Sequence, residues 1–359
     1  MDVRFWPPLK LLACARVGRG ILYTFDWDTL ARSSGDYIQQ IEDKISTFLL
    51  SAVETFTQLQ SESTNSTDQN NQMSLSKIKK LLLGMTMILR SEIVNWFCCH
   101  RFTLSWSRNF IVRNTLSWYS YGIINRFETA RGLIQNERLN IMLRFTFAYK
   151  YYFEEDVQRI WTNMSERDRH SVRIIGKYSI SIRYWLNALE HRSALDWTDI
   201  SLNIKEEEFF VGNCFGIRYY FTKLLSRDIR YKCILSCLEH DCLHAFDLYC
   251  CLSELNADEL NQMFTRLPQD ILCKVFQSFL HWPFQIIFLE VINRFQTHIT
   301  EDIYFALIRE LIDKVSEPWQ DYAYEDILKY LWNVLSPKYS PGVVRYLKKV
   351  NGIVRICAN

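Results

Sequence analysis

The sequence predicts an all-α protein, and three observations support this fold class. Apolar residues recur at three- and four-residue intervals along most of the 359-residue chain, which is the period of a helix with one buried face. Several of these stretches follow residues that favour a helix N-terminus, such as Ser165, Asn256 and Thr300. No comparable run alternates apolar and polar residues as a half-buried strand would.

A long amphipathic helix is expected before position 60. Its apolar stripe consists of Ile38, Ile41, Ile45, Phe48, Leu49, Ala52, Phe56 and Leu59. Residues 60–76, QSESTNSTDQNNQMSLS, have no apolar rhythm, which predicts a flexible polar loop. A stripe resumes at Ile78 and continues to Leu89. The chain therefore divides into an N-terminal helical segment at 1–59, the loop at 60–76 and a helical array at 77–359.

From about residue 145 the expected helices are shorter and have recognisable starts. One stripe runs from Tyr149 to Met164, and Ser165 can then cap the next helix. Asn256 followed by Glu259 has the spacing of a capping box. Thr300 precedes two acidic residues, which are favourable at the positive end of a helix dipole. Each signal places a helix start.

The very apolar stretch FLHWPFQIIFLEVI, at 279–292, is predicted to join two helices. Proline is unfavourable inside a helix but favourable in its first turn, so one helix should end near His281 and the next should begin around Pro283. This run and the longest apolar runs elsewhere in the chain are shorter than the roughly 18 to 20 apolar residues that span a bilayer, so we expect no transmembrane helix. The stretch should form a core helix whose buried stripe is Phe284, Ile287, Phe288, Val291, Ile292 and Phe295.

Aromatic residues indicate a repeat in the second half of the chain. One series of aromatic residues has successive spacings of roughly 33 residues, as in helix-hairpin repeats. The series is Tyr152, Trp185, Tyr220, Tyr249 and Trp282. Neither the ankyrin nor the tetratricopeptide consensus is present. An irregular α-solenoid of helix pairs and a compact helical array both fit this pattern.

Net charge, the N-terminal sequence and the cysteine content limit the classes of protein to which this chain can belong. The formal net charge of +2 lacks the excess of Lys and Arg that attracts nucleic acid or acidic lipid without specificity. Pro7, Pro8 and Lys10 interrupt the apolar core that a signal peptide would need. The 11 cysteines are an odd number, and several lie in apolar helical patterns, including Cys98, Cys99, Cys250 and Cys251. We therefore expect reduced, buried thiols in a cytoplasmic or nuclear protein.

Candidate zinc ligands lie at 233–244, where Cys233, Cys237, His240 and His244, with Cys242 between the histidines, form two pairs at helical spacing. On one continuous helix Cys233 and His244 would lie ~16 Å apart along the axis, too far to share an ion. Only a sharp break near 239–241 would bring the two pairs together.

No catalytic motif is recognisable in the chain. It has no G-x-S-x-G, H-E-x-x-H, P-loop or complete dinucleotide-binding pattern. The carboxylate runs at 154–156 and 206–208 fit solvent-facing or helix-opening positions, rather than two acids held in different environments. We expect neither catalysis nor a cofactor.

Residues 93–127 combine arginines with aromatic side chains and contain no acidic residue. Arginine neutralises phosphate and aromatic rings stack on unpaired bases, so these residue types suit single-stranded nucleic acid. They also suit a core with arginine stems packed along aromatic edges, and the stretch holds few arginines for a nucleic-acid module. The candidate interaction surface is Arg101, Trp106, Arg108, Arg113 and Trp118.

Four phrases resemble a lineage-expanded family of arachnid (spider) helical proteins of unassigned function. They are RFTFAYKYYFEEDVQRIWTNMSERDR at 144–169, DLYCCLSELNADELNQMF at 247–264, FLHWPFQIIFLEV at 279–291 and FWPPLKLLACARV at 5–17. Some members are described as SOCS-box-like, which would imply a ubiquitin-ligase adaptor. Here four residues separate Leu9 from Cys14, one more than that contact pattern has. A short amphipathic helix docked on the core is the simpler interpretation, and the resemblance implies no catalytic residue.

These observations favour a non-catalytic protein-protein interaction scaffold with an unknown protein partner. Helix-pair arrays present extended grooves for other proteins, although this step from fold to function is an analogy. The alternatives are single-stranded nucleic-acid binding through 93–127 and a ubiquitin-ligase adaptor role through the N-terminal helix.

The predicted helix face at 284–295 can be tested by mutation. Phe288→Ala should lower the free energy of unfolding by about 3 to 5 kcal/mol, because it empties a core position. Glu290→Ala, off the stripe, should change it by no more than about 0.5 kcal/mol. Urea denaturation followed by circular dichroism measures both free energies of unfolding. Comparable small losses would show that Phe288 does not lie on the buried face of the helix.

Overall fold

The computed structural model describes residues 5–26, 30, 36–60, 68–101, 103–104, 113–203 and 206–335. Within these ranges the regular structure is helical, and the one strand-type pairing is an isolated bridge between Trp118 and Ile124. The all-α prediction is confirmed.

The N-terminal helices are α1 (Leu9–Leu22), α3 (Asp36–Gln60) and α4 (Asp68–His100). Short helices follow: α6 (Arg126–Gln135), α7 (Ile141–Lys150), α8 (Glu154–Asn163), α9 (Glu166–Gly176), α10 (Ile180–His191), α11 (Trp197–Asn203), α12 (Glu206–Gly212), α13 (Ile217–Tyr220) and α14 (Arg227–Glu239). The last are α15 (Ala245–Ser253), α16 (Ala257–Arg266), α17 (Gln269–Ser278), α18 (Gln285–Arg294), α19 (Glu301–Ser316) and α20 (Tyr324–Leu335), with 3-10 turns η2 (Cys214–Gly216), η3 (Phe221–Lys223) and η4 (Gln296–His298).

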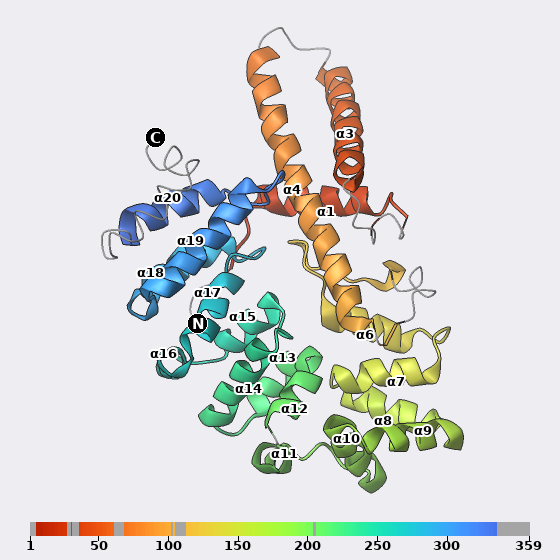
Figure 1. Ribbon diagram of the computed structural model, residues 1–359. Helices are drawn as coiled ribbons and strands as arrows, with labels where there is room; N and C mark the ends of the chain where they lie inside the picture. The colour runs from red at the N-terminus through yellow and green to blue at the C-terminus, as the bar shows by residue number, and fades with distance from the viewer. Residues whose placement is uncertain are drawn as a thin grey trace.

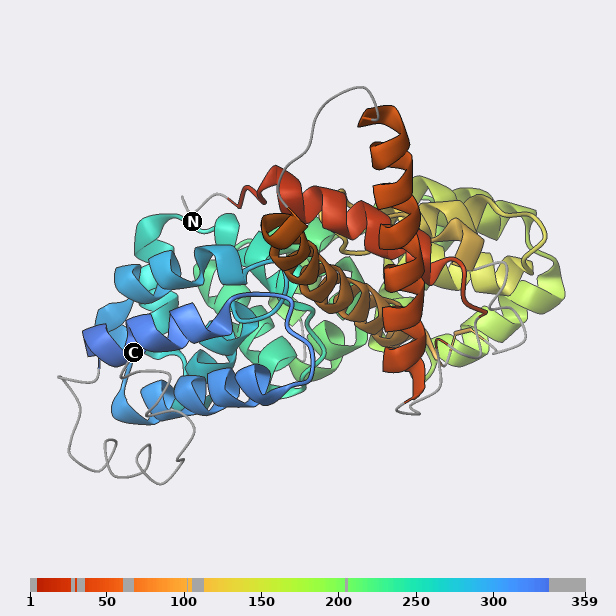
Figure 2. The ribbon, with the colours of Figure 1, turned by 90° about the horizontal axis from the view of Figure 1, so that it is seen from above.

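The helices from α6 to α20 follow one another along a curve, and α4 runs through the middle of the molecule (Figure 1). Seen from above, α1, α3 and α4 lie between a wing containing α6 to α10 and a wing containing the later helices (Figure 2). Many contacts join helices close in sequence, for example α6 with α7, α7 with α8 and α19 with α20. A regular solenoid with a period near 33 residues stays a prediction.

The N-terminal helices share a core with the array. Both α1 and α3 pack against α4, and α1 buries Cys14, Ala15, Ile21 and Leu22. At Gly18 an added Cβ would lie 2.9 Å from Thr86 Oγ1, so the two helices cross too closely for a side chain there. The expected amphipathic helix docked on the core is present.

Residues 68–76 are helical, whereas the sequence predicts a loop at 60–76. The helix α4 begins at Asp68, and residues 61–67 lie outside the described part of the chain. An acidic residue is favourable at a helix N-terminus, and Gln, Met, Leu and Lys in this stretch are good helix formers. A polar segment can thus extend a helix whose later turns are packed.

The stripe at 149–164 is divided between two helices. The helix α7 ends at Lys150 and α8 begins at Glu154, because the chain turns at Tyr152, which has φ +60°. The buried Tyr152 hydroxyl donates a hydrogen bond to Asn213 Oδ1 at 2.9 Å. This contact offsets an unfavourable backbone conformation, and periodicity alone does not reveal it.

The predicted helix starts at Ser165, Asn256 and Thr300 are confirmed. Ser165 accepts a hydrogen bond from the Asp168 N–H, and Asn256 forms both bonds of the capping box. The junction at 279–292 is also confirmed, although α17 ends at Ser278 and α18 begins at Gln285. The peptide bond between Trp282 and Pro283 is cis. All six stripe residues of this helix are buried: Phe284, Ile287, Phe288, Val291, Ile292 and Phe295.

Among the described residues, one helix is long and apolar enough to cross a membrane by length and composition. It comprises residues Leu75–His100 of α4, and 67% of its most apolar window is buried inside the fold. The core helix of a soluble protein meets the same criterion. Because α1 and α3 already cover it, we interpret it as the core helix.

The ten cysteines in the described part of the chain are free thiols. Two of them, Cys98 and Cys99, are exposed, whereas their apolar context predicts burial. Their neighbours Trp96, Phe97 and His100 fill the interior instead, so the two thiols lie on the outer face of the last turns of α4.

The C-terminal residue of α4, His100, is buried in an aromatic stack. Its ring lies 4.2 Å from the Trp96 ring and 4.5 Å from the Phe215 ring. Because Nδ1 faces the Trp96 carbonyl oxygen at 2.6 Å, it carries the ring proton, and Nε2 accepts from the Tyr151 hydroxyl at 2.9 Å. Burial is the main cause that lowers the pKa of His100 to about 3.

This shift predicts a loss of stability in acid. A histidine in the unfolded chain has a pKa of about 6.5, so below that pH the unfolded chain takes up a proton that the folded protein excludes. The loss begins near pH 6.5 and grows until the folded pKa, near 3, is reached. By pH 5 it should reach about 2 kcal/mol.

His100→Phe keeps an aromatic ring in the stack and removes the titrating group. Urea unfolding at pH 7 and pH 5 should show an acid-induced loss about 2 kcal/mol larger for the natural protein than for the variant. Other titrating groups contribute equally to both proteins. Equal losses would contradict the assignment.

Candidate functional site

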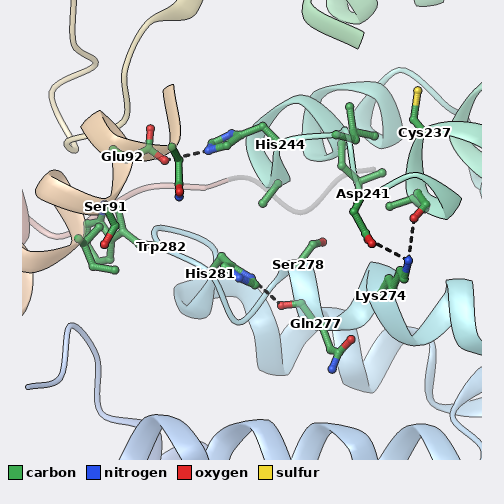
Figure 3. A pocket seen from close by; sticks show the side chains of 16 residues that line it. Ser91, Glu92, Cys237, Asp241, His244, Lys274, Gln277, Ser278, His281 and Trp282 are labelled. Carbon is green, nitrogen blue, oxygen red and sulfur yellow. Dashed lines mark hydrogen bonds and ion pairs between the residues drawn. The ribbon is translucent and has the colours of Figure 1, made fainter. Parts of the chain in front are cut away.

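A cavity of about 380 Å³ opens between α4, the connection from α14 to α15, and α17 (Figure 3). Its volume falls in the range of small-molecule sites. The cavity is lined by both apolar and polar side chains. The polar ones include Ser91, Glu92, Asn95, Asp241, His244, Lys274, Gln277, Ser278 and His281. The cavity is therefore a candidate polar site.

The central contact of this cavity joins Glu92 and His244. His244 is the N-cap of α15, where its Nδ1 accepts a hydrogen bond from the Phe246 N–H at 3.2 Å. The ring proton therefore lies on Nε2, which donates to Glu92 Oε1 at 2.8 Å (Figure 3). The other carboxylate oxygen, Oε2, accepts from the Ile124 N–H at 3.3 Å. One carboxylate thus links α4, α15 and the segment before α6.

Two further charged groups, Arg126 and Asp247, are buried near this contact, and a third, Arg218, is partly exposed. Arg126 Nη1 lies 3.6 Å from Asp247 Oδ2, and these side chains are only 7% and 5% exposed. Arg218 Nε lies 4.0 Å from the other oxygen of Asp247. Two acids and two arginines therefore form one buried network with His244.

The network lowers the pKa of Glu92. Burial alone would raise it, but the electrostatic attraction and hydrogen bond of the His244 Nε2–H group and the charge of Arg126 outweigh that effect. For Arg126, burial alone would lower the pKa, and the charges of Asp247 and Glu92 raise it above its ordinary value. Both groups are therefore held in their charged forms.

The remaining reactive groups of the cavity also have partners. Lys274 Nζ lies 2.8 Å from Asp241 Oδ1 and donates to the Leu238 carbonyl oxygen at 2.9 Å (Figure 3). The ring of His281 contacts the Gln277 carbonyl through Nδ1 at 3.1 Å. The thiol of Cys237 donates to the Phe210 carbonyl at 3.8 Å. We interpret the cavity as a structural polar cluster.

The chain breaks where a zinc site would require it. The helix α14 ends at Glu239, and Asp241 has φ +49°. The break does not gather the ligands, because the described residues contain no group of three His, Cys, Asp or Glu side chains that could hold a metal ion.

The candidate ligands have separate roles instead. Cys233 is fully buried, and its sulfur lies 3.9 Å from the Tyr220 hydroxyl. The hydrogen bond with Cys233 and burial raise the pKa of Cys237 well above its ordinary value. His240 contacts the Ser236 carbonyl through Nδ1 at 3.0 Å, whereas His244 binds Glu92.

Part of the candidate interaction surface at 93–127 is occupied by contacts within the protein itself. The side chain of Arg113 donates to the Leu22 carbonyl oxygen at 3.2 Å and lies 5.1 Å over the Tyr23 ring. Trp118 Nε1 donates to the Tyr23 hydroxyl at 3.1 Å. These contacts fasten the end of α1, a role with no local sequence signal. Arg101 is exposed, and Trp106 and Arg108 lie outside the described residues.

A second hollow, of about 450 Å³, lies between α1 and the turn at 119–122. Large apolar side chains stand exposed at this end of α1, since Trp6 is 75% and Leu9 is 80% exposed. Such exposure is typical of interaction sites. The hollow is lined by Leu9, Leu12, Ala13, Ala15, Arg16, Arg19, Tyr119, Ser120 and Gly122.

No family model, curated protein or solved structure matches this chain. The function is therefore argued from the geometry, and the resemblance to arachnid proteins stays an expectation.

The buried network predicts unequal costs for two Asp→Asn changes. Asp247→Asn leaves the buried Arg126 without its nearest acid and should cost about 3 to 5 kcal/mol of stability. Asp241→Asn breaks an ion pair whose carboxylate is 78% exposed and should cost about 1 kcal/mol or less. Asparagine tolerates the positive φ at 241, which makes this a matched control. Chemical denaturation compares the two, and similar losses would show that the network is not stabilising.

Proposed function

We propose that the protein is a non-catalytic protein-protein interaction scaffold. The observation that carries this proposal is the exposure of Leu9, which lines the hollow along α1, and of Trp6 three residues before it. Covering large apolar side chains with a partner contributes about 1.5 to 3 kcal/mol for each before the cost of association. In the cavity around Glu92 and His244 the charged groups are paired with one another, which supports a structural role for that cavity.

The proposed contact uses Leu9 at the start of α1, without Cys14, the other residue of the SOCS-box-like pattern. Cys14 is buried by the packing of α1 on α4, so its thiol faces the protein's own core. The use of Arg113 and Trp118 around Tyr23 likewise favours a protein partner over single-stranded nucleic acid.

Affinity purification from native cells, followed by mass spectrometry with and without nuclease, tests this function. The natural protein should retain partners after nuclease treatment, and Trp6→Ala/Leu9→Ala should lose them. Tyr178→Ala/Leu202→Ala is a matched control, because it removes one exposed aromatic and one exposed leucine elsewhere. A lack of nuclease-resistant partners would contradict the proposal, and partners released by nuclease would support nucleic-acid binding.

A further inference from the structure

The hollow beside α1 has a fixed wall. The Gly122 N–H bonds the Tyr119 carbonyl at 3.0 Å, and the Tyr119 N–H bonds the Ile123 carbonyl at 2.9 Å. Trp282 Nε1 donates to the Tyr121 carbonyl at 2.7 Å, which ties this turn to the other wing. Because these internal hydrogen bonds fix the wall of the hollow, a partner would bear little cost for ordering it.

Glycine allows this turn to approach the N-terminal helices. Gly122 has φ +88°, and an added Cβ there would lie 2.6 Å from Leu89 Cδ2 and 3.4 Å from Ala15 Cβ. A side chain at this position would push the turn away from α1 and α4 and change the shape of the hollow.

The hollow is positively charged as well as apolar. Leu9, Leu12 and Ala13 supply carbon surface, and Arg16 and Arg19 reach the same space. The helix α1 contains no acidic residue, and no ion pair joins Arg16 or Arg19 to another described residue. Two arginines without an ion pair to any described residue lie beside an exposed leucine, so a ligand that is both apolar and acidic would complement this surface.

We propose that this hollow binds an acidic peptide segment of a partner protein, with one large apolar side chain in the hollow and carboxylates on Arg16 and Arg19. This inference rests on the proposed scaffold function and names the chemistry of its partner. Guanidinium groups bind carboxylates with two parallel hydrogen bonds. A concave site also favours a peptide over a lipid surface, because a side chain can fill the hollow and a bilayer covers convex surfaces.

Peptide selection on the full-length protein tests this inference. Short random peptides displayed on phage should yield binders that combine acidic residues with a large apolar residue. Fluorescence polarisation with a selected peptide should show affinity about tenfold or more weaker for Arg16→Glu/Arg19→Glu, which corresponds to about 1.4 kcal/mol or more. Leu9→Asp should weaken it similarly, and aspartate at the first turn of α1 is favourable for the helix.

The control is Arg167→Glu/Arg183→Glu, which makes the same change in net charge at exposed arginines of α9 and α10. It should bind the peptide as the natural protein does. Selected peptides without an acidic and apolar pattern, or equal binding by Arg16→Glu/Arg19→Glu, would overturn the inference. Arginine-dependent binding to vesicles of acidic phospholipid, with no peptide enriched, would overturn it in favour of a membrane.

The scaffold proposal and the acidic-peptide inference can be disproved independently of each other. If native partners depend on Trp6 and Leu9 but are indifferent to Arg16→Glu/Arg19→Glu, the scaffold function stands and the acidic-peptide inference is wrong. If the selected peptides bind through the arginines and no native partner is captured, the hollow is a peptide site and the scaffold proposal fails.

Discussion

The packing of the two wings on α4 depends on a network of charged side chains that are largely shielded from water. Glu92 accepts hydrogen bonds from His244 and from the backbone of Ile124, and Arg126 with Asp247 lies directly behind. If α15 or the segment before α6 moved away, it would leave a charged group unpaired in a poorly polar interior, which is costly. Apolar stripes can slide by a turn and still be covered, whereas this network satisfies its charges in one arrangement.

Local features of the fold could be predicted from the sequence. Caps such as Ser165 and Asn256, and the stripe through Phe288, depend on residues within a few positions of each other. The contact between Glu92 and His244 could not, because 152 positions separate them and no local pattern selects that pair. Sequence analysis identified His244 as a zinc candidate and did not identify Glu92.

The high content of aromatic residues is explained by the core, which the sequence alone also did not reveal. Around His100, the rings of Trp96, Phe147, Tyr151 and Phe215 stack at centroid distances between 4.2 and 6.4 Å. Aromatic and arginine side chains near Trp96 therefore reflect a core built from flat rings, with cations at its edge. Residue types alone could not separate this from a nucleic-acid surface, because both use the same π faces.

The helix α4 joins two environments in one element. Its C-terminal part lies in the charged and aromatic interior, and its N-terminal part extends with α3 away from the rest of the molecule (Figure 1). At a rise of about 1.5 Å per residue, its 33 residues form a continuous rod. A sideways force on the far end of the hairpin acts as torque about the crossing with α1. A force applied there would therefore be transmitted along α4 to the contacts of Glu92 and His100.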